Sequence, residues 1–275
     1  MLFLPFSLGP VFIGLRPSWL GGLITGTGPA NANIAIEAST DMVLWRYHSI
    51  VAANAFGVWQ LSEPNTIAPP YRFYRALSAQ QLPPGLINWW QADNSYVDSF
   101  GGILGTPVND LGFADGQRGR AFGFDGVGKL LSLGGAPVPV PWTACFWVRR
   151  EDAVDASSAL IADDFTSLKL EQFGSPARVV GFTQFGVADY YFAHTVPTNT
   201  WTHVAFVGTA DGTALYFNGG HMETLPASIS LPRGILGART TLGDKLNGLL
   251  DEITWFNRAL TPAEIDQVRN VTRGP

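Results

Sequence analysis

The feature that most constrains the fold is the run from Trp201 to Leu225, which reads WTHVAFVGTADGTALYFNGGHMETL. Two dipeptides within it, Asp211-Gly212 and Asn218-Gly219, favour the positive φ angles of tight hairpin turns. A short strand, TALYF, lies between the two turns, so the pattern predicts a three-stranded antiparallel meander. Strands of this kind each have one apolar face, and two sheets must stack to bury those faces.

The composition of the whole chain also favours an all-β protein. Only 14% of its 275 residues are charged, well below the roughly 25% of an average soluble domain, and it has 31 glycines and 19 prolines. Short apolar runs separated by turn residues continue along the chain, among them AFGFDG, KLLSLGG and WTACFWVRR. These runs predict a β-sandwich.

Several classes of function are disfavoured by the same data. The net charge is −5 and no basic run is present, so nucleic-acid binding is not expected, because phosphate neutralisation needs clustered cations. The single cysteine, Cys145, excludes an internal disulfide, and its apolar neighbours predict a buried thiol.

The N-terminal run MLFLPFSLGPVFIGL is apolar but contains two prolines and two glycines. It is too short and too broken for a membrane span. We expect it to form a first strand or an apolar strand-like arm, with a retained signal-like peptide as the alternative.

A domain boundary is expected at LSAQQLPPG, residues 77–85, because polar and proline-rich segments commonly link domains. The first eighty residues carry 4 Arg against 3 acids, whereas the rest carries 13 basic against 19 acidic residues. We therefore expect a small β module over residues 1–80 and a larger β-sandwich over residues 81–275.

The closing stretch contains a strand with two adjacent carboxylates. Regular alternation from Leu249 places Asp251 on the face shared by Ile253 and Trp255, and it sends Glu252 to the surface. Since that shared face is apolar, Asp251 should be partly buried and should need a partner.

A short helix is predicted after this strand. Thr261 is a suitable N-cap, Pro262 fits the first helical position, and Glu264 completes a capping box. The helix should end near Asn270.

Four blocks of the sequence together resemble a known family: GLINWWQADNSYVDSFGGILGT, GFADGQRGRAFGFDGVGKLLSL, WTHVAFVGTADGTALYFNGG and LNGLLDEITWFNRALTPAEI. In this order they resemble laminin-G-like domains, over roughly residues 83–270. The resemblance implies a concanavalin A-like jelly-roll β-sandwich and a place outside the cell or on its surface. The preceding stretch, DMVLWRYHSIVAANAFGVWQLSEP with YRFYRAL, resembles a small β module of bacterial surface proteins, either fibronectin-like or immunoglobulin-like.

The resemblance also implies one structural calcium ion. In the similar sandwiches an aspartate at the position of Asp251 often helps to hold calcium together with backbone carbonyls, and Asp98 in YVDSFGG matches an acidic position of the first block. Such oxygen ligands suit calcium. We expect Asp98 and Asp251 to be its ligands; the alternative is that Asp251 accepts backbone N–H bonds from a neighbouring loop.

Related sandwiches include glycoside hydrolases, which carry paired carboxylates on one strand face in the pattern E-x-D-x-E. None of the seven glutamates begins this pattern, and Asp251 and Glu252 are neighbours that should face opposite ways. The histidines lack zinc-site spacing, and no G-x-S-x-G elbow is present. The sequence therefore predicts that the protein is not an enzyme.

Tyr190 and Tyr191 are the candidate ligand-binding residues. They are consecutive in VADYYFAH, so one of them must leave the core, and an exposed ring can stack on the apolar face of a sugar. We expect a non-catalytic binding or adhesion protein that recognises carbohydrate or a surface protein. The alternative is a structural subunit of an extracellular filament or virion surface that self-assembles through the N-terminal apolar strand.

Overall fold

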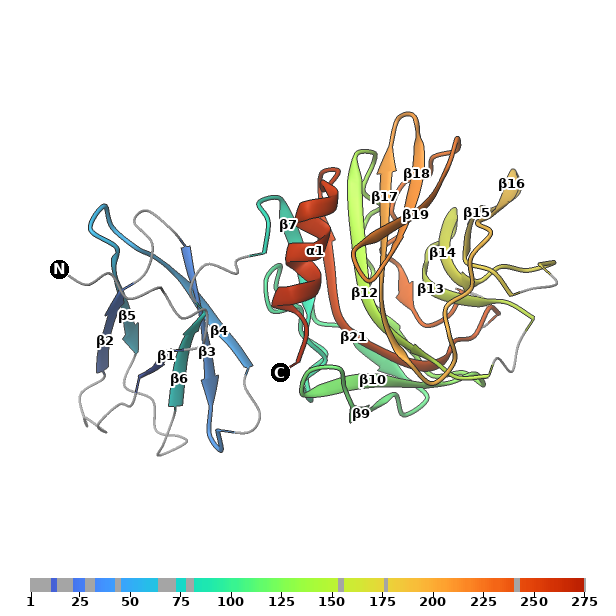
Figure 1. Ribbon diagram of the computed structural model, residues 1–275. Helices are drawn as coiled ribbons and strands as arrows, with labels where there is room; N and C mark the ends of the chain where they lie inside the picture. Colours follow the sequence, from blue (N-terminus) through green and yellow to red (C-terminus); the bar gives the residue numbers. More distant parts are fainter. Residues whose placement is uncertain are drawn as a thin grey trace. The chain divides into compact units, whose positions relative to one another are not determined.

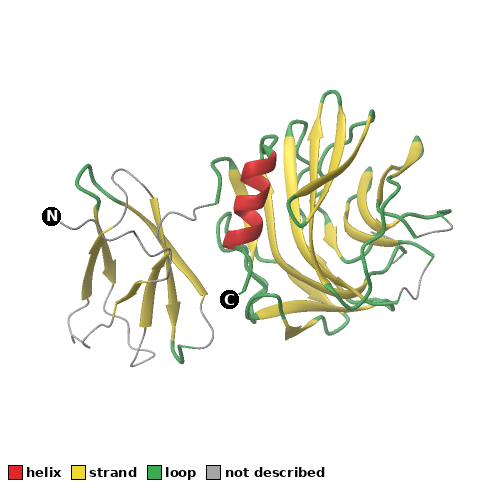
Figure 2. Ribbon diagram, in the orientation of Figure 1, coloured by secondary structure: helices red, strands yellow, loops and turns green. Residues whose placement is uncertain are grey.

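The computed structural model describes residues 11–13, 22–27, 33–42, 46–63, 73–77, 82–152, 156–175, 178–239 and 243–274. Within these ranges strands dominate, and a single α-helix lies near the C-terminus (Figure 2). The chain divides into two compact units, Met1–Gln81 and Leu82–Pro275.

The first unit contains two antiparallel sheets. The larger has the order β1-β6-β3-β4, and the smaller is formed by β2 and β5 (Figure 1). The bounds are β1 (Val11–Ile13), β2 (Gly22–Thr27), β3 (Asn33–Ser39), β4 (Arg46–Ala52), β5 (Val58–Glu63) and β6 (Phe73–Leu77). A small core contains Ile24, Ile34 and Trp59 from both sheets.

The N-terminal apolar segment is described only in part. Residues Val11–Ile13 form β1, which pairs with β6 inside the larger sheet of the first unit. The predicted first strand is therefore present over these three residues, and residues 1–10 of the proposed assembly arm lie outside the described ranges.

The second unit stacks an eight-stranded sheet on a seven-stranded sheet (Figure 1). The eight-stranded sheet has the order β19-β18-β17-β12-β21-β10-β9, with β7 paired to β21. Its strands are β7 (Leu86–Trp90), β9 (Gly112–Asp115), β10 (Arg120–Asp125), β12 (Trp142–Arg150), β17 (Trp201–Thr209), β18 (Gly212–Phe217), β19 (Gly220–Leu225) and β21 (Asn247–Phe256).

The seven-stranded sheet has the order β16-β15-β14-β13-β20-β11-β8. Its strands are β8 (Thr106–Val108), β11 (Leu130–Ser132), β13 (Ser158–Ala162), β14 (Thr166–Glu171), β15 (Gly181–Gln184), β16 (Ala188–Tyr191) and β20 (Ile235–Leu236). Buried side chains from both sheets, such as Phe146, Phe206, Leu168 and Phe182, form one continuous core. The predicted all-β jelly-roll sandwich is thus confirmed.

The predicted three-stranded meander is also confirmed, although its first turn lies at Ala210 and Asp211, and Gly212 is already the first residue of β18. Strands β17, β18 and β19 form the antiparallel meander, with the second turn at Asn218 (φ 50°) and Gly219 (φ 87°). Among the tryptophans of the eight-stranded sheet, Trp89, Trp147 and Trp255 are buried, whereas Trp201 is only half-buried.

Helix α1 (Pro262–Val271) begins where the capping signals predict, and it ends one residue beyond Asn270, close to the expected end. The backbone N–H of Glu264 donates to the Thr261 hydroxyl (3.3 Å), and the backbone N–H of Thr261 donates to the Glu264 carboxylate (2.8 Å). The apolar face of α1 packs against the eight-stranded sheet around Cys145, where burial raises the pKa of the thiol to about 12. No helix in the described ranges is long and apolar enough to cross a membrane.

Candidate functional site

Strand β21 is irregular at the two adjacent carboxylates. Cys145 of β12 pairs with Thr254, but Trp147 pairs with Asp251, so two residues of β21 lie opposite one residue of β12. This is a β-bulge, and Glu252 within it has a φ of 49°, in the left-handed region. The bulge interrupts the two-residue alternation of the strand.

The bulge overturns two predictions made from regular alternation. Leu250, Ile253 and Trp255 all belong to the core between the sheets, so Asp251 does not share the face of Ile253 and Trp255. Glu252 was expected at the surface, but it is only 1% exposed. Asp251 is buried as predicted, although it lies on the opposite face of the strand.

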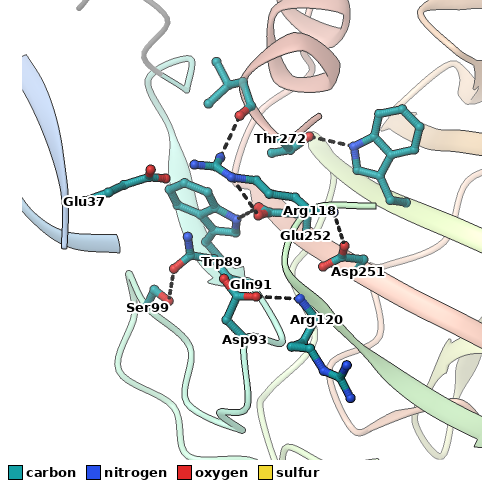
Figure 3. Close-up of polar contacts among 12 residues, drawn as sticks. Glu37, Trp89, Gln91, Asp93, Ser99, Arg118, Arg120, Asp251, Glu252 and Thr272 are labelled. Carbon is teal, nitrogen blue, oxygen red and sulfur yellow. Dashed lines mark hydrogen bonds and ion pairs between the residues drawn. The ribbon is translucent and has the colours of Figure 1, made fainter. Parts of the chain in front are cut away.

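Figure 3 shows the polar contacts around this bulge. The indole N–H of Trp89 donates to the Glu252 carboxylate (2.6 Å), and the guanidinium of Arg118 lies 3.8 Å from the other oxygen of that carboxylate. The Arg118 backbone N–H donates to Asp251 Oδ2 (2.9 Å), while its side chain donates to the carbonyl of Val271 (2.9 Å). Arg118 therefore links both carboxyl groups to the C-terminal end of α1.

We call Asp93, Asp251 and Glu252 the acidic cluster, because all three are buried and they interact electrostatically. Burial raises the pKa of Glu252 well above its usual value; the charge of Arg118 opposes this rise, and the other two carboxyls add to it. Burial likewise raises the pKa of Asp251, against the hydrogen bond from the Arg118 backbone. Arg118 thus compensates a group of acids that would be costly to bury without it.

The two predicted calcium ligands lie in different hydrogen-bond networks. Asp98 Oδ1 accepts from the backbone N–H groups of Trp89 (2.7 Å) and Phe100 (2.9 Å), and its Oδ2 accepts from the side-chain amide of Asn88. Both oxygens of Asp98 are therefore engaged by protein donors, which suits a structural carboxylate better than a cation ligand.

Asp251 fits a cation better than Asp98 does. Its Oδ1 is buried and has no hydrogen-bond partner among the described residues. Within the same ranges, no three His, Cys, Asp or Glu side chains gather so that they could hold a metal ion. A calcium ion at Asp251 would consequently need backbone carbonyls for most of its ligands.

A separate feature is a hollow of about 550 Å³ on the seven-stranded sheet, lined by residues of β14 and β15, by the turn after β15, and by Arg239, Gly243 and Asp244. We call it the Lys169 hollow. Its polar lining includes Lys169, Thr183, Gln184, Asp189 and Asp244.

The polar side chains of the Lys169 hollow are held in place by one another. The ammonium of Lys169 donates to Asp244 (2.9 Å) and to the hydroxyl of Ser157 (3.1 Å). The side-chain amide of Gln172 donates to Asp189 (2.7 Å). A ligand therefore meets polar groups that are already ordered, which lowers the entropic cost of binding.

Aromatic side chains stand beside this polar lining. Phe173 lines the Lys169 hollow and is 58% exposed. Tyr191 is 44% exposed, and its hydroxyl donates to the backbone carbonyl of Phe173 (3.2 Å). Tyr190 instead stacks on core residue Phe182, with 4.7 Å between the ring centroids. The two tyrosines thus face opposite ways as predicted, and Tyr191 is the one that leaves the core.

The sequence reasoning missed most of the hollow. Phe173 precedes the turn residues GSP, and an apolar ring beside a turn is a signal that could have identified it. Lys169 and Asp244 are far apart in the sequence, and no local sequence pattern predicts that they form an ion pair.

Comparison with known proteins supports the sandwich assignment. A family model described as the concanavalin A-like lectin/glucanases superfamily matches residues 125–266. Domain 4 of AbnA, a GH43 extracellular arabinanase from Geobacillus stearothermophilus, in complex with arabinotriose, is similar over 67% of this chain and 98% of its own, with a TM-score of 0.56 and 19% identity. No curated protein sequence matches the chain.

Two further solved structures share the fold. The binding domain of botulinum neurotoxin DC, in complex with rat synaptotagmin II, is similar over 70% of this chain and 53% of its own, with a TM-score of 0.54 and 12% identity. A mutant of Trypanosoma rangeli sialidase displaying trans-sialidase activity is similar over 82% of this chain and 44% of its own, with a TM-score of 0.52 and 13% identity.

Proposed function

Since the chain belongs to the concanavalin A-like lectin/glucanases superfamily, we propose that it is a non-catalytic extracellular protein that binds carbohydrate through the Lys169 hollow. Domain 4 of AbnA is in complex with arabinotriose, and the neurotoxin domain is in complex with synaptotagmin II, so similar sandwiches bind sugars as well as proteins. The chemistry of the hollow favours the first class of ligand.

The observation that carries this proposal is the combination of exposed rings with an ordered polar lining. Sugars have apolar C–H faces that pack on aromatic rings, and their hydroxyl groups both donate and accept hydrogen bonds. Phe173 offers a ring in the lining, and Tyr191, whose hydroxyl donates to the Phe173 carbonyl, offers a second exposed ring beside it. Lys169, Asp189 and Asp244 offer donors and acceptors. Ligand sites in proteins commonly combine apolar walls with a few fixed polar groups in this way.

The carboxylates of the hollow are arranged for binding rather than for hydrolysis. Asp244 is paired with Lys169, and Asp189 accepts from Gln172 and from the hydroxyl of Thr183 (2.6 Å). A glycoside hydrolase needs one carboxylic acid that is free to protonate the leaving oxygen. Both aspartates already accept hydrogen bonds from protein donors, so neither carboxyl group is placed to protonate a leaving oxygen.

A polysaccharide panel tests the proposal. Arabinan, xylan, laminarin and soluble cellulose derivatives should be compared by affinity electrophoresis, and at least one should retard the protein without any release of reducing ends. Phe173→Ala and Tyr191→Ala should each weaken binding by about fivefold or more, as expected for an aromatic hot spot. Phe100→Ala is the matched control, because Phe100 is exposed but does not line the hollow. Retardation by no polysaccharide, or release of reducing ends, would contradict the proposal.

The family resemblance also implies a calcium ion. We keep this ion in the proposal with Asp251 as a ligand, and we leave out Asp98. If the native state binds calcium there, a chelator should lower the melting temperature, and at free calcium about 100 times Kd the stabilisation lost is about 2.7 kcal/mol. Asp251→Asn should abolish this response, whereas Asp98→Asn should destabilise the protein and leave the response intact. A melting temperature that does not respond to chelation would show that Asp251 is held by protein groups only.

A further inference from the structure

A second hollow, of about 390 Å³, adjoins the Lys169 hollow. We call it the Phe165 hollow, after the ring that lines it and is 69% exposed. Gln184, at the end of β15, lines both hollows, and the backbone N–H of the next residue, Phe185, donates to the carbonyl of Phe165 (2.8 Å). Each volume lies within the range of about 300–1,000 Å³ that is usual for small-molecule sites. A ligand that occupies both must therefore extend across Gln184.

The walls of the Phe165 hollow are fixed by hydrogen bonds. Val138 and Leu231 exchange both of their backbone hydrogen bonds, at 3.0 and 2.8 Å, and so join the two segments that flank the hollow. The hydroxyl of Thr166 donates to the carbonyl of Ser230 (3.1 Å), which ties the wall to β14. The second hollow is thus preformed, as the Lys169 hollow is.

The lining of the two hollows carries balanced charge. In the Lys169 hollow the cations Lys169 and Arg239 are matched by Asp189 and Asp244, and Lys169 is paired directly with Asp244. The residues that line the Phe165 hollow are proline, valine, phenylalanine, threonine, glutamine, serine and isoleucine. This surface has no net positive charge that would attract an acidic sugar polymer. An uncharged polymer adds no charge of its own, so the existing balance between the cations and the aspartates of the lining is kept.

From these features we infer that the ligand is an uncharged linear polysaccharide whose chain lies across Gln184, with sugar units in both hollows. This inference rests on the proposed function. It narrows the ligand to several consecutive units within a polysaccharide chain, rather than a single sugar. Each hollow has its own exposed ring, Phe173 in one and Phe165 in the other, so each can hold a sugar face.

The test is a length series measured by isothermal titration calorimetry on the full chain. Arabino-, xylo-, laminari- and cello-oligosaccharides of two to eight units should be titrated, together with galacturonate oligomers of the same lengths. Affinity for one neutral series should rise with length and then level off once both hollows are filled. Phe165→Ala should weaken binding of the longest chains by about fivefold or more, and it should weaken binding of disaccharides by a smaller factor. Phe173→Ala should weaken binding of oligosaccharides of every length. Phe100→Ala should leave the affinity for short and for long oligosaccharides unchanged.

The outcomes separate the inference from the proposed function. If a sugar binds with the same affinity at every length, or if Phe165→Ala leaves the long chains unaffected, the inference is overturned while sugar binding stands. Tighter binding of galacturonate oligomers would also overturn it. If no oligosaccharide binds, the proposed function itself fails. Circular dichroism of the variants guards against misfolding, which is not expected because both rings are exposed.

Discussion

Arg118→Met should lower the free energy of unfolding of the second unit by about 3–5 kcal/mol, the usual cost of removing one partner from a buried ion pair. The substitution removes the guanidinium near Glu252 and the hydrogen bond to the carbonyl of Val271, while the backbone bond to Asp251 persists. The acidic cluster would then be buried without its compensating cation. Urea denaturation at neutral pH measures the loss.

Arg120→Met is the matched control. Arg120 is two residues away, and its side chain pairs with exposed Asp115, so its loss should cost less than about 1 kcal/mol. The double variant Arg118→Met, Glu252→Gln should recover part of the stability, because the uncompensated carboxylate is also removed. Equal losses in the Arg118 and Arg120 variants would contradict the structural role of the cluster.

Acidification should destabilise the protein through His203. This ring is buried against Trp147, and neither of its nitrogens has a hydrogen-bond partner among the described residues. Burial lowers the pKa of His203 to about 3; the nearby charge of Arg269 adds to this effect and that of Asp266 opposes it. Between the ordinary pKa of about 6.5 and about 3, the unfolded chain therefore binds a proton that the native state does not. Stability should fall as the pH falls, by about 2.7 kcal/mol for this group at pH 4.5.

The variant His203→Leu isolates this contribution. Its unfolding free energy should fall less steeply between pH 7 and 4.5 than that of the wild type, whatever its absolute stability. His221→Leu is the control, because His221 is exposed and its replacement should leave the slope unchanged. The same slope in His203→Leu and wild type would show that the ring is protonated in the native state.

The predictions of the second hairpin turn and of the start of α1, which depended on neighbouring residues, succeeded. The turn at Asn218-Gly219 is set by the positive φ angles of those two residues, and the start of α1 is set by Thr261 and Glu264 bonding to each other's backbone. These structures are decided within a few residues, so the sequence shows them directly.

Predictions that depended on pairing between distant segments were less secure. The face of Asp251 follows from a bulge that forms only where β21 pairs with β12, and nothing in the local pattern of LLDEITWF marks it. Similarly, Gln184 and Phe165 form part of one surface because β14 and β15 pair in a particular register. The sequence could therefore indicate that one of Tyr190 and Tyr191 is exposed, but it could not indicate which one, nor the hollows nearby.

The central claim, that the Lys169 hollow binds carbohydrate, is tested most directly by a crystal structure of the protein with the oligosaccharide that binds best in the panel. We predict electron density for a sugar ring packed on Phe173, with its hydroxyl groups within hydrogen-bond distance of Lys169, Asp189 or Asp244. Density for the sugar at another surface, with the Lys169 hollow holding only solvent, would contradict the account.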